Sequence, residues 1–312
     1  MALVQANGLS KNFGEFKAVD NVSFSVERGE VAGFLGPNGA GKSTTMKMLT
    51  GFLPPDAGQA LIDDVDVAID PVSAKTKLGY LPEGAPAYGD MTVAEYLDFI
   101  AGMRGLSAGV RTERLAEMVE RVRLQDVWNR RIENLSKGFA RRVGIAQALL
   151  HDPEVLILDE PTDGLDPNQK HEMRLLIRQI AQEKAIIIST HILEEVEAVC
   201  TRAIIIAEGR VVADKTPMAL MQRDSDARQV QVVVLAAHAE SAQAVIAAAA
   251  MVDQVQLIEQ RGDKARLMVH SSHAEFSPVH VLELLSHQAV DVHEVGVYRA
   301  SLEDVFREIT RV

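Results

Sequence analysis

A glycine-rich segment that ends in a lysine and two hydroxyl residues has the composition and spacing of a phosphate-binding loop. Its residues are Gly36, Pro37, Asn38, Gly39, Ala40, Gly41, Lys42, Ser43 and Thr44. In the spacing G-x-x-x-x-G-K-[ST], glycines let successive backbone N–H groups turn towards an anion, and the following helix N-terminus adds positive potential. We expect Lys42 to reach the β- and γ-phosphates of a nucleotide and the Ser43 hydroxyl to bind Mg²⁺. The alternative is a glycine-rich turn with a coincidental Lys-Ser pair.

Two consecutive carboxylates form a second candidate for chemistry. Asp159 and Glu160 follow the apolar run 155–158, which is typical of a buried strand. In a phosphate-loop ATPase, a carboxylate at this strand end helps to hold Mg²⁺, and its neighbour polarises the attacking water. We therefore predict that Asp159 helps to bind Mg²⁺ and that Glu160 is catalytic. A buried strand with a polar end, which is common, is the alternative.

Short apolar runs and helix-like stretches alternate around these residues and predict the elements that position them. Residues 30–35 are typical of a short buried strand that enters the glycine-rich loop, and residues 44–49 leave it as a helix. The β-branched-rich runs 185–188 and 203–206 repeat the pattern of 155–158. Such alternation predicts an α/β fold with a parallel sheet whose two faces are both covered.

The first part of the chain changes from β-rich to helical. Residues 1 to about 75 carry strand-like alternation with one helix, whereas residues from about 90 to 150 are helical. Thr92 and Glu95 have the spacing of a capping box, which predicts the start of a helix that runs towards Met103. We expect this helical part to form a subdomain.

The last part of the chain has its own pattern. The polar stretch 222–228 is predicted as a linker. From residue 229 onwards, strand and helix patterns follow a βαββαβ order, which indicates a small ferredoxin-like α+β domain. We thus expect one domain at 1–221 and an accessory domain at 229–312.

Composition disfavours several classes of protein. The 312 residues are 47% hydrophobic and 24% charged, and the net charge of −12 disfavours a nucleic-acid binder that works through a basic surface. The single cysteine, Cys200, cannot form an internal disulfide, which fits a reducing cytoplasm. The most apolar window, 244–252, is about half the ~20 residues that a spanning helix needs, and no signal peptide is predicted. We expect any action on a membrane to pass through a partner.

Further motifs follow the glycine-rich loop in a fixed order. They are Leu135-Ser136-Lys137-Gly138-Phe139, then Asp159-Glu160-Pro161-Thr162 with Gly164-Leu165-Asp166-Pro167, then Ser189-Thr190-His191, with an aromatic residue upstream at Phe13. Over residues 1 to about 220, the set resembles the ATP-binding cassette (ABC) family, whose signature L-S-G-G-Q, D-loop and switch histidine stand in this order. The resemblance implies a phosphate-loop cassette with a mixed sheet core, an antiparallel β part and a helical subdomain. It also implies ATP and Mg²⁺ as ligands.

The resemblance implies roles for residues near the phosphates. Glu160 would act as the general base or orient the attacking water, and His191 would hold the γ-phosphate and that water in line. Phe13 would lie against the adenine. Taken singly, a histidine after a strand is more often structural and a phenylalanine more often belongs to the core. The ordered set of motifs favours the functional roles.

In the resembled family, a second copy of the cassette completes the site. Ser136, Lys137 and Gly138 would contact ATP in trans at a helix N-terminus, and Asp166 would join the two opposed sites. The alternatives are purely structural roles, in which Ser136 is only a helix N-cap and Asp166 with Pro167 only starts a helix. Lys137 replaces a glycine of the family pattern, and either adds positive charge near the opposed nucleotide or is exposed to solvent. A homodimer with two sandwiched ATP molecules is therefore expected.

One further departure concerns Glu83, which stands where the family usually has a glutamine. A carboxylate keeps an oxygen ligand for Mg²⁺ but adds a charge. We therefore predict retained Mg²⁺·ATP binding and altered coupling to the membrane partner.

The function implied by the resemblance is ATP hydrolysis that energises transport through separately encoded integral membrane subunits. The L-P-E and L-S-K-G-F motifs and the ending 301–306 resemble a branch of bacterial exporters, which implies export and a peripheral place at the cytoplasmic face of the inner membrane. The alternative is a soluble cassette ATPase that acts on ribosomes or DNA. A single cassette, the lack of sustained heptads and the acidic balance argue against it, and no nucleic-acid partner is expected. The accessory domain could add a regulatory or dimer-stabilising role.

Overall fold

The computed structural model describes residues 2–221, 228–273, 275–288, 290–298 and 301–310. The chain divides into two compact units, Met1–Pro217 with Phe306–Val312, and Met218–Val305. The linker predicted at 222–228 lies outside the described residues apart from Arg228. The domain bounds expected from the sequence, 1–221 and 229–312, stay a prediction.

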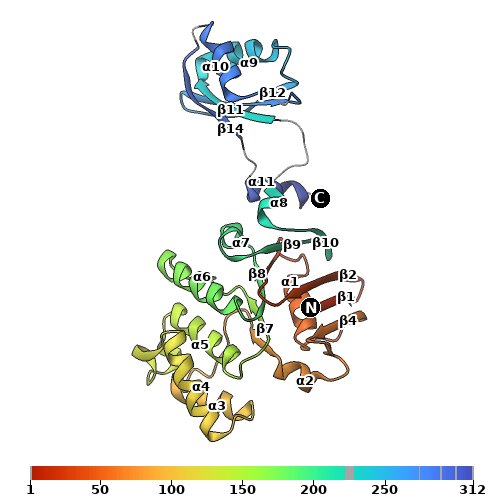
Figure 1. The fold of residues 1–312 in the computed structure, drawn as a ribbon, viewed down its shortest axis with the longest axis vertical. Helices are drawn as coiled ribbons and strands as arrows, with labels where there is room; N and C mark the ends of the chain where they lie inside the picture. Colours follow the sequence, from red (N-terminus) through yellow and green to blue (C-terminus); the bar gives the residue numbers. More distant parts are fainter. Residues whose placement is uncertain (1, 222–227, 274, 289, 299–300, 311–312) are drawn as a thin grey trace. The chain divides into compact units, whose positions relative to one another are not determined.

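The first unit is built on a six-stranded sheet with the strand order β10-β9-β3-β8-β7-β6. Strands β7, β8, β9 and β10 of this sheet are labelled in Figure 1. Its strands are β3 (Val31–Leu35), β6 (Leu78–Leu81), β7 (Val155–Asp159), β8 (Ala185–Thr190), β9 (Arg202–Ala207) and β10 (Arg210–Lys215). All neighbours pair parallel except β9 and β10. Every residue of β3, β7 and β8 is buried, as expected for a sheet covered on both faces. The strands predicted at 155–158, 185–188 and 203–206 are confirmed.

A four-stranded antiparallel sheet of order β2-β1-β4-β5 accounts for the predicted β-rich part. Its strands are β1 (Ala2–Phe13), β2 (Phe16–Glu27), β4 (Ala57–Ile62) and β5 (Val65–Asp66). β1 and β2 form one long hairpin that turns at Gly14, whose φ of 62° lies in the left-handed region. The pairing places Phe13 opposite Phe16 at the end of the hairpin.

Three helices between β6 and β7 form the predicted helical subdomain. They are α3 (Val93–Met103), α4 (Ala108–Arg121) and α5 (Lys137–Leu149), with the 3₁₀ turns η1 (Gln125–Val127) and η2 (Ile132–Asn134) between the last two. The predicted capping box opens α3: Thr92 Oγ1 accepts from the Glu95 N–H at 3.2 Å, and the Glu95 carboxylate accepts from the Thr92 N–H at 2.8 Å. The remaining helices before residue 222 are α1 (Lys42–Leu49), α2 (Pro71–Thr76), α6 (Pro167–Ala181), α7 (Leu193–Val199) and α8 (Pro217–Met221).

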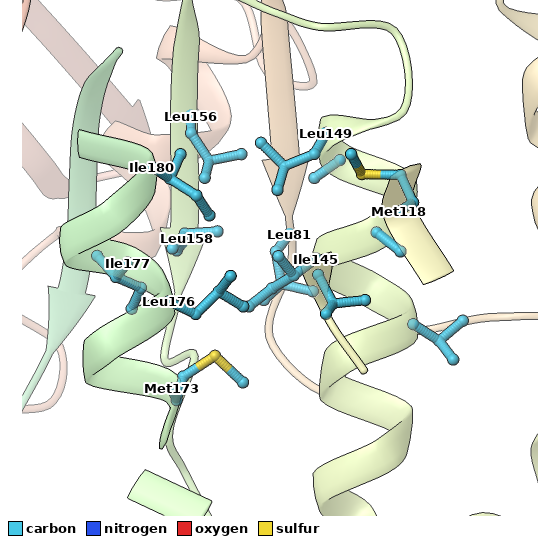
Figure 2. Close-up of a cluster of buried hydrophobic side chains, with 14 of the residues drawn as sticks. Leu81, Met118, Ile145, Leu149, Leu156, Leu158, Met173, Leu176, Ile177 and Ile180 are labelled. Atoms are coloured by element: carbon cyan, nitrogen blue, oxygen red, sulfur yellow. The ribbon is translucent and has the colours of Figure 1, made fainter. Parts of the chain in front are cut away.

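Strand β7 is held by apolar side chains on both of its faces. Figure 2 shows Leu156 and Leu158 between residues of α6, such as Ile177, and residues of α5, such as Leu149. The alternate residue Ile157 points to a second buried cluster, to which α1 contributes. Because close-packed side chains resist displacement, this packing fixes the carboxyl end of β7, where the acidic residues stand.

The second unit contains a four-stranded sheet of order β12-β13-β11-β14, in which all neighbours are antiparallel. Its elements are β11 (Arg228–Leu235), η3 (Ala236–His238), α9 (Ala239–Ala247), β12 (Gln254–Arg261), β13 (Lys264–Ser271), α10 (Pro278–Ser286) and β14 (Val292–Val297). Side chains of α9 and α10 pack with Val232 and Leu267 in its core. The strands and longer helices follow the predicted βαββαβ order. α11 (Leu302–Ile309) comes after β14, and the boundary between the units falls within it.

Candidate nucleotide-binding and hydrolysis site

The glycine-rich loop lies between the end of β3 and the start of α1, and two of its glycines have no room for a side chain. A Cβ on Gly36 would lie 2.4 Å from the carbonyl oxygen of Ile206. A Cβ on Gly41, whose φ is 104°, would lie 2.5 Å from the carbonyl oxygen of Ala18. The loop is therefore held tightly against neighbouring backbone, and only glycine fits at both positions.

Lys42 folds back across this loop. Its side chain is buried, and Nζ donates to the carbonyl oxygens of Gly36 at 2.8 Å and Pro37 at 3.2 Å. Burial lowers the pKa of Lys42, and the nearby carboxylates of Glu160 and Asp159 oppose that effect. An ammonium group has three donors, so one remains beyond the two loop carbonyls.

The two acidic residues at the end of β7 have different surroundings. Asp159 is buried, and its carboxylate accepts a hydrogen bond from the Ser189 hydroxyl on β8. Glu160 has a φ of 49°, a left-handed conformation that is unfavourable for a residue with a side chain. Its N–H donates to the carbonyl oxygen of Ser189 at 3.0 Å. The chain thus turns sharply after Asp159, and the hydrogen bond to Ser189 of β8 fixes the backbone of Glu160.

The Glu160 carboxylate lies against His191, the first residue after β8. Nδ1 of His191 is 2.9 Å from Oε1 and 3.0 Å from Oε2 of Glu160. Burial raises the pKa of Glu160 above its ordinary value, although hydrogen bonding to His191 and the charge of Lys42 act in the opposite direction. A carboxylate with a raised pKa is a better proton acceptor when it is ionised.

One cavity of about 420 Å³ brings most of the predicted site residues together. The predicted residues that line it are Phe13, Asn38, Gly39, Gly41, Lys42, Ser43, Thr44, Glu83, Glu160 and His191. Phe13 is 53% exposed, so it is not a core residue. Asp159 is not among the lining residues and lies at the end of β7 beside Ser189.

Three residues that the sequence motifs do not predict also line the cavity: Phe16, Ala18 and Asp163. Phe16 is 62% exposed and pairs with Phe13 across the hairpin turn. The signal that could have found it is the spacing Phe-Gly-Glu-Phe, because a tight hairpin turn at the glycine brings the two aromatic rings to one end.

The signature and D-loop residues do not line this cavity. Ser136 caps α5 and its hydroxyl accepts from the Phe139 N–H at 3.4 Å, whereas Asp166 caps α6 and accepts from the Gln169 N–H at 2.9 Å. The capping roles considered for both residues are therefore present. A Cβ on Gly138 would lie 2.7 Å from Cδ of Gln169, so the two segments touch each other within one chain.

The Lys137 side chain also belongs to this contact between the signature and the D-loop. Its Cδ lies 3.2 Å from where a Cβ on Gly164 would stand. Within the described part of the chain, Lys137 thus lies beside the D-loop segment rather than in the nucleotide cavity.

These features define a phosphate-loop nucleotide-binding domain with an acidic residue and a histidine beside the phosphate site. The family model described as ABC transporter matches residues 19–163. The chain is 32% identical over 309 residues to the linearmycin resistance ATP-binding protein LnrL of Bacillus subtilis (strain 168), which covers 99% of this chain and 98% of that protein. The chain therefore belongs to the family of ABC transporter ATP-binding proteins, whose cassettes bind ATP, and the predicted family and cassette fold are confirmed.

Other relatives match the first unit. The Nod factor export ATP-binding protein I of Burkholderia orbicola (strain AU 1054) is 39% identical over 225 residues, or 72% of this chain and 74% of that protein. The probable multidrug ABC transporter ATP-binding protein YbhF of Escherichia coli (strain K12) is 37% identical over 228 residues, but the match spans only 39% of its length. A solved structure of the ATP binding subunit of an ABC transporter superposes with a TM-score of 0.65 at 33% identity, covering 70% of this chain and 91% of that one.

Among the described residues, no helix is both long and apolar enough to cross a membrane.

Proposed function

We propose that this protein hydrolyses ATP to ADP and phosphate and that this reaction drives export through separately encoded transmembrane subunits. The observation that carries the proposal is the Glu160 carboxylate, held against His191 in the cavity that Lys42 also lines. The relatives named for linearmycin resistance, Nod factor export and multidrug transport support export as the direction.

The cavity supports an in-line attack of water on the γ-phosphate. The loop N–H groups and Lys42 bind the phosphates, while the exposed rings of Phe13 and Phe16 offer faces for the adenine. Glu160 accepts a proton from the attacking water, and the water oxygen forms a bond to the γ-phosphorus. At the same time, the bond between the γ-phosphorus and the β–γ bridging oxygen breaks, and ADP leaves. His191 orients the carboxylate and the water.

The donor set at the phosphate end suits Mg²⁺. Ser43 and Glu83 present oxygen atoms to the cavity, and the Asp159 carboxylate stands at the end of the adjacent strand. Hydroxyl and carboxylate oxygens are hard ligands of the kind that Mg²⁺ takes alongside nucleotide phosphates. Ser43 and Asp159 would hold the ion, with Glu83 near it, and when bound it neutralises charge on the phosphates.

A second copy of the chain would complete the site. Ser136, Lys137 and Gly138 lie outside the cavity of their own chain, where helix α5 presents its N-terminus. A helix N-terminus favours a phosphate, and head-to-tail pairing would bring this one to the γ-phosphate of the opposed cavity. Asp166 would then lie between the two sites.

Aromatic residues near the helical subdomain supply a surface for the membrane partner. The exposed rings of Tyr88 and Phe99 pack edge-to-face with centroids 5.8 Å apart, and Tyr96 adjoins Tyr88. Tyr80 and the exposed Phe52 line a neighbouring cavity of about 300 Å³. Aromatic side chains are enriched at protein interfaces, so we place the transmembrane subunits here, which puts the protein at the cytoplasmic face of the inner membrane. We also propose that residues 229–312 form an accessory domain with a regulatory or dimer-stabilising role.

The test is ATP hydrolysis by the purified parent protein and by Glu160→Gln, with nucleotide binding measured in parallel. The amide cannot accept the proton of water, so hydrolysis should fall at least 100-fold on the usual scale of general-base removal. Binding of Mg²⁺·ATP should persist. Undiminished hydrolysis by Glu160→Gln would overturn the assignment of the base.

A further inference from the structure

Glu195 in α7 is a buried carboxylate that the proposed hydrolysis does not use. It is only 4% exposed, and it does not line the nucleotide cavity. A buried carboxylate is unfavourable unless its oxygens receive hydrogen bonds, so its partners are informative.

The two carboxylate oxygens of Glu195 accept hydrogen bonds from two different segments, the turn after β7 and the last residue of β8. The Thr162 hydroxyl donates to Oε1, and the Thr190 hydroxyl donates to Oε2 at 3.1 Å. Thr162 stands two residues after Glu160, and Thr190 directly precedes His191. Both threonines are buried, so water does not compete for these bonds.

Additional contacts fix the start of α7 to the same place. The Thr190 hydroxyl accepts from the Ile192 N–H at 3.0 Å, and the Glu195 N–H donates to the carbonyl oxygen of Ile192 at 3.2 Å. Arg174 of α6 lines the same small cavity as Glu195, Thr162 and Thr190, and brings a positive charge to it. The Glu195 carboxylate thus belongs to a buried polar cluster that adjoins the segments carrying Glu160 and His191.

We propose that Glu195 is a positioning residue that sets the separation between Glu160 and His191. It touches neither side chain and acts through the two threonines, each of which lies within two residues of one member of the pair. Since a displacement of about 1 Å in a reacting group costs up to roughly 100-fold in rate, a link of this kind affects turnover strongly. The proposal rests on the ATP hydrolysis proposed above.

The kinetic test compares Glu195→Ala with Glu197→Ala, an exposed glutamate of the same helix. Glu195→Ala should lower kcat roughly 10- to 100-fold and leave the affinity for ATP within about twofold, because the phosphate loop is untouched. Glu197→Ala should change neither. Glu195→Gln keeps the shape and one acceptor oxygen, so it should recover part of the lost kcat.

The variant Thr190→Val tests the same link independently, in case Glu195→Ala lowers kcat only because it folds poorly. It removes one hydroxyl at nearly constant volume and should reproduce the fall in kcat with unchanged ATP affinity. Combined with His191→Ala, Glu195→Ala should cause a smaller loss than it causes in the parent, because one of the two residues that it positions is already absent. Independent losses that multiply in the double variant would contradict a positioning role.

A readout without ATP separates this proposal from the proposed function. The ¹⁵N resonances of the His191 imidazole, assigned by comparison with His191→Ala, should shift in Glu195→Ala and Thr190→Val but not in Glu197→Ala. If the parent hydrolyses ATP while Glu195→Ala and Thr190→Val keep both its kcat and the His191 resonances, the positioning role is wrong and the proposed function stands. If the parent does not hydrolyse ATP, the proposed function fails and the resonances still decide whether Glu195 positions His191.

Discussion

Nδ1 of His191 lies 2.9 Å from Oε1 of Glu160, although the two residues are 31 positions apart in the sequence. The parallel pairing of β7 and β8, with Asp159 opposite Ser189, brings them together at the same edge of the sheet. Glu160 adopts a left-handed backbone conformation there, with its N–H bound to the carbonyl oxygen of Ser189. The position of the carboxylate is thus set by the neighbouring strand as well as by its own.

The pH dependence of hydrolysis should report the environment of Glu160. A general base must be ionised, so kcat should rise with pH through the pKa of Glu160. Because burial raises that pKa, the acidic limb should lie at higher pH than for an exposed glutamate. The measurement is kcat at saturating Mg²⁺·ATP across the acidic range, with ATP affinity measured at each pH. A limb at or below the pKa of an exposed glutamate would contradict the account.

Glu160→Gln should unfold at an equal or higher temperature than the parent at neutral pH. A glutamate whose pKa is raised by folding contributes stability that is fully present below its unfolded pKa and is lost as the pH rises through the folded pKa. The neutral amide avoids that loss, so its advantage should shrink as the pH falls towards about 4. Thermal unfolding at both pH values measures the effect, with the exposed Glu197→Gln as the control. A lower unfolding temperature for Glu160→Gln at neutral pH would be the contrary result.

At least one of the variants Phe13→Ala and Phe16→Ala should weaken ATP binding. Stacking of a base on an aromatic ring contributes about 1–3 kcal/mol, so the dissociation constant should rise roughly 5- to 100-fold for the ring that carries the adenine. Titration with a fluorescent ATP analogue measures it. Phe52→Ala removes an equally exposed ring away from the cavity and serves as the control. Unchanged affinity in both hairpin variants would place the adenine elsewhere.

Gly41→Ala should be more damaging than Gly39→Ala. Both glycines have a positive φ, so each alanine carries a left-handed strain of roughly 1–2 kcal/mol. Only the Cβ at 41 meets neighbouring backbone, the carbonyl oxygen of Ala18, and nothing lies within 4 Å of a Cβ at 39. Thermal unfolding without nucleotide should show a further loss of about 1–3 kcal/mol in Gly41→Ala. Equal losses would mean that the loop relaxes freely.

Glu83→Ala should retain ATP binding but change the response to Mg²⁺ and to the membrane partner. Glu83 is exposed and lines the nucleotide cavity. Glu83→Gln is the matched variant, because it keeps an oxygen ligand and removes only the charge. The measurement is the Mg²⁺ dependence of hydrolysis with and without the transmembrane subunits. Identical curves for the parent and Glu83→Ala would remove Glu83 from the site.

Local patterns were enough to predict most elements of the first unit. The apolar runs that became β7, β8 and β9 are continuous and β-branched, and the capping box of Thr92 and Glu95 has the predicted hydrogen bonds. Helix α4 begins at Ala108, although the residues of its first turn carry no apolar stripe that would mark the start of a helix in the sequence.

Features that depend on tertiary contacts escaped prediction. Glu195 stands among other charged residues in α7 and has the local appearance of an exposed residue, and only the fold brings Thr162 and Thr190 to it. Phe16 was missed because its role depends on the hairpin turn rather than on a motif.

The binding partner of the ATP-bound protein decides whether this protein energises transport across a membrane. Glu160→Gln, which should retain ATP, would be added with Mg²⁺·ATP to solubilised membranes of the native cell and recovered by affinity capture, with Lys42→Ala as the control that fails to hold the phosphates. We expect a polytopic membrane protein to be recovered with Glu160→Gln and identified by mass spectrometry. Recovery of only a soluble homodimer, or of ribosomes or DNA, would contradict the transport function.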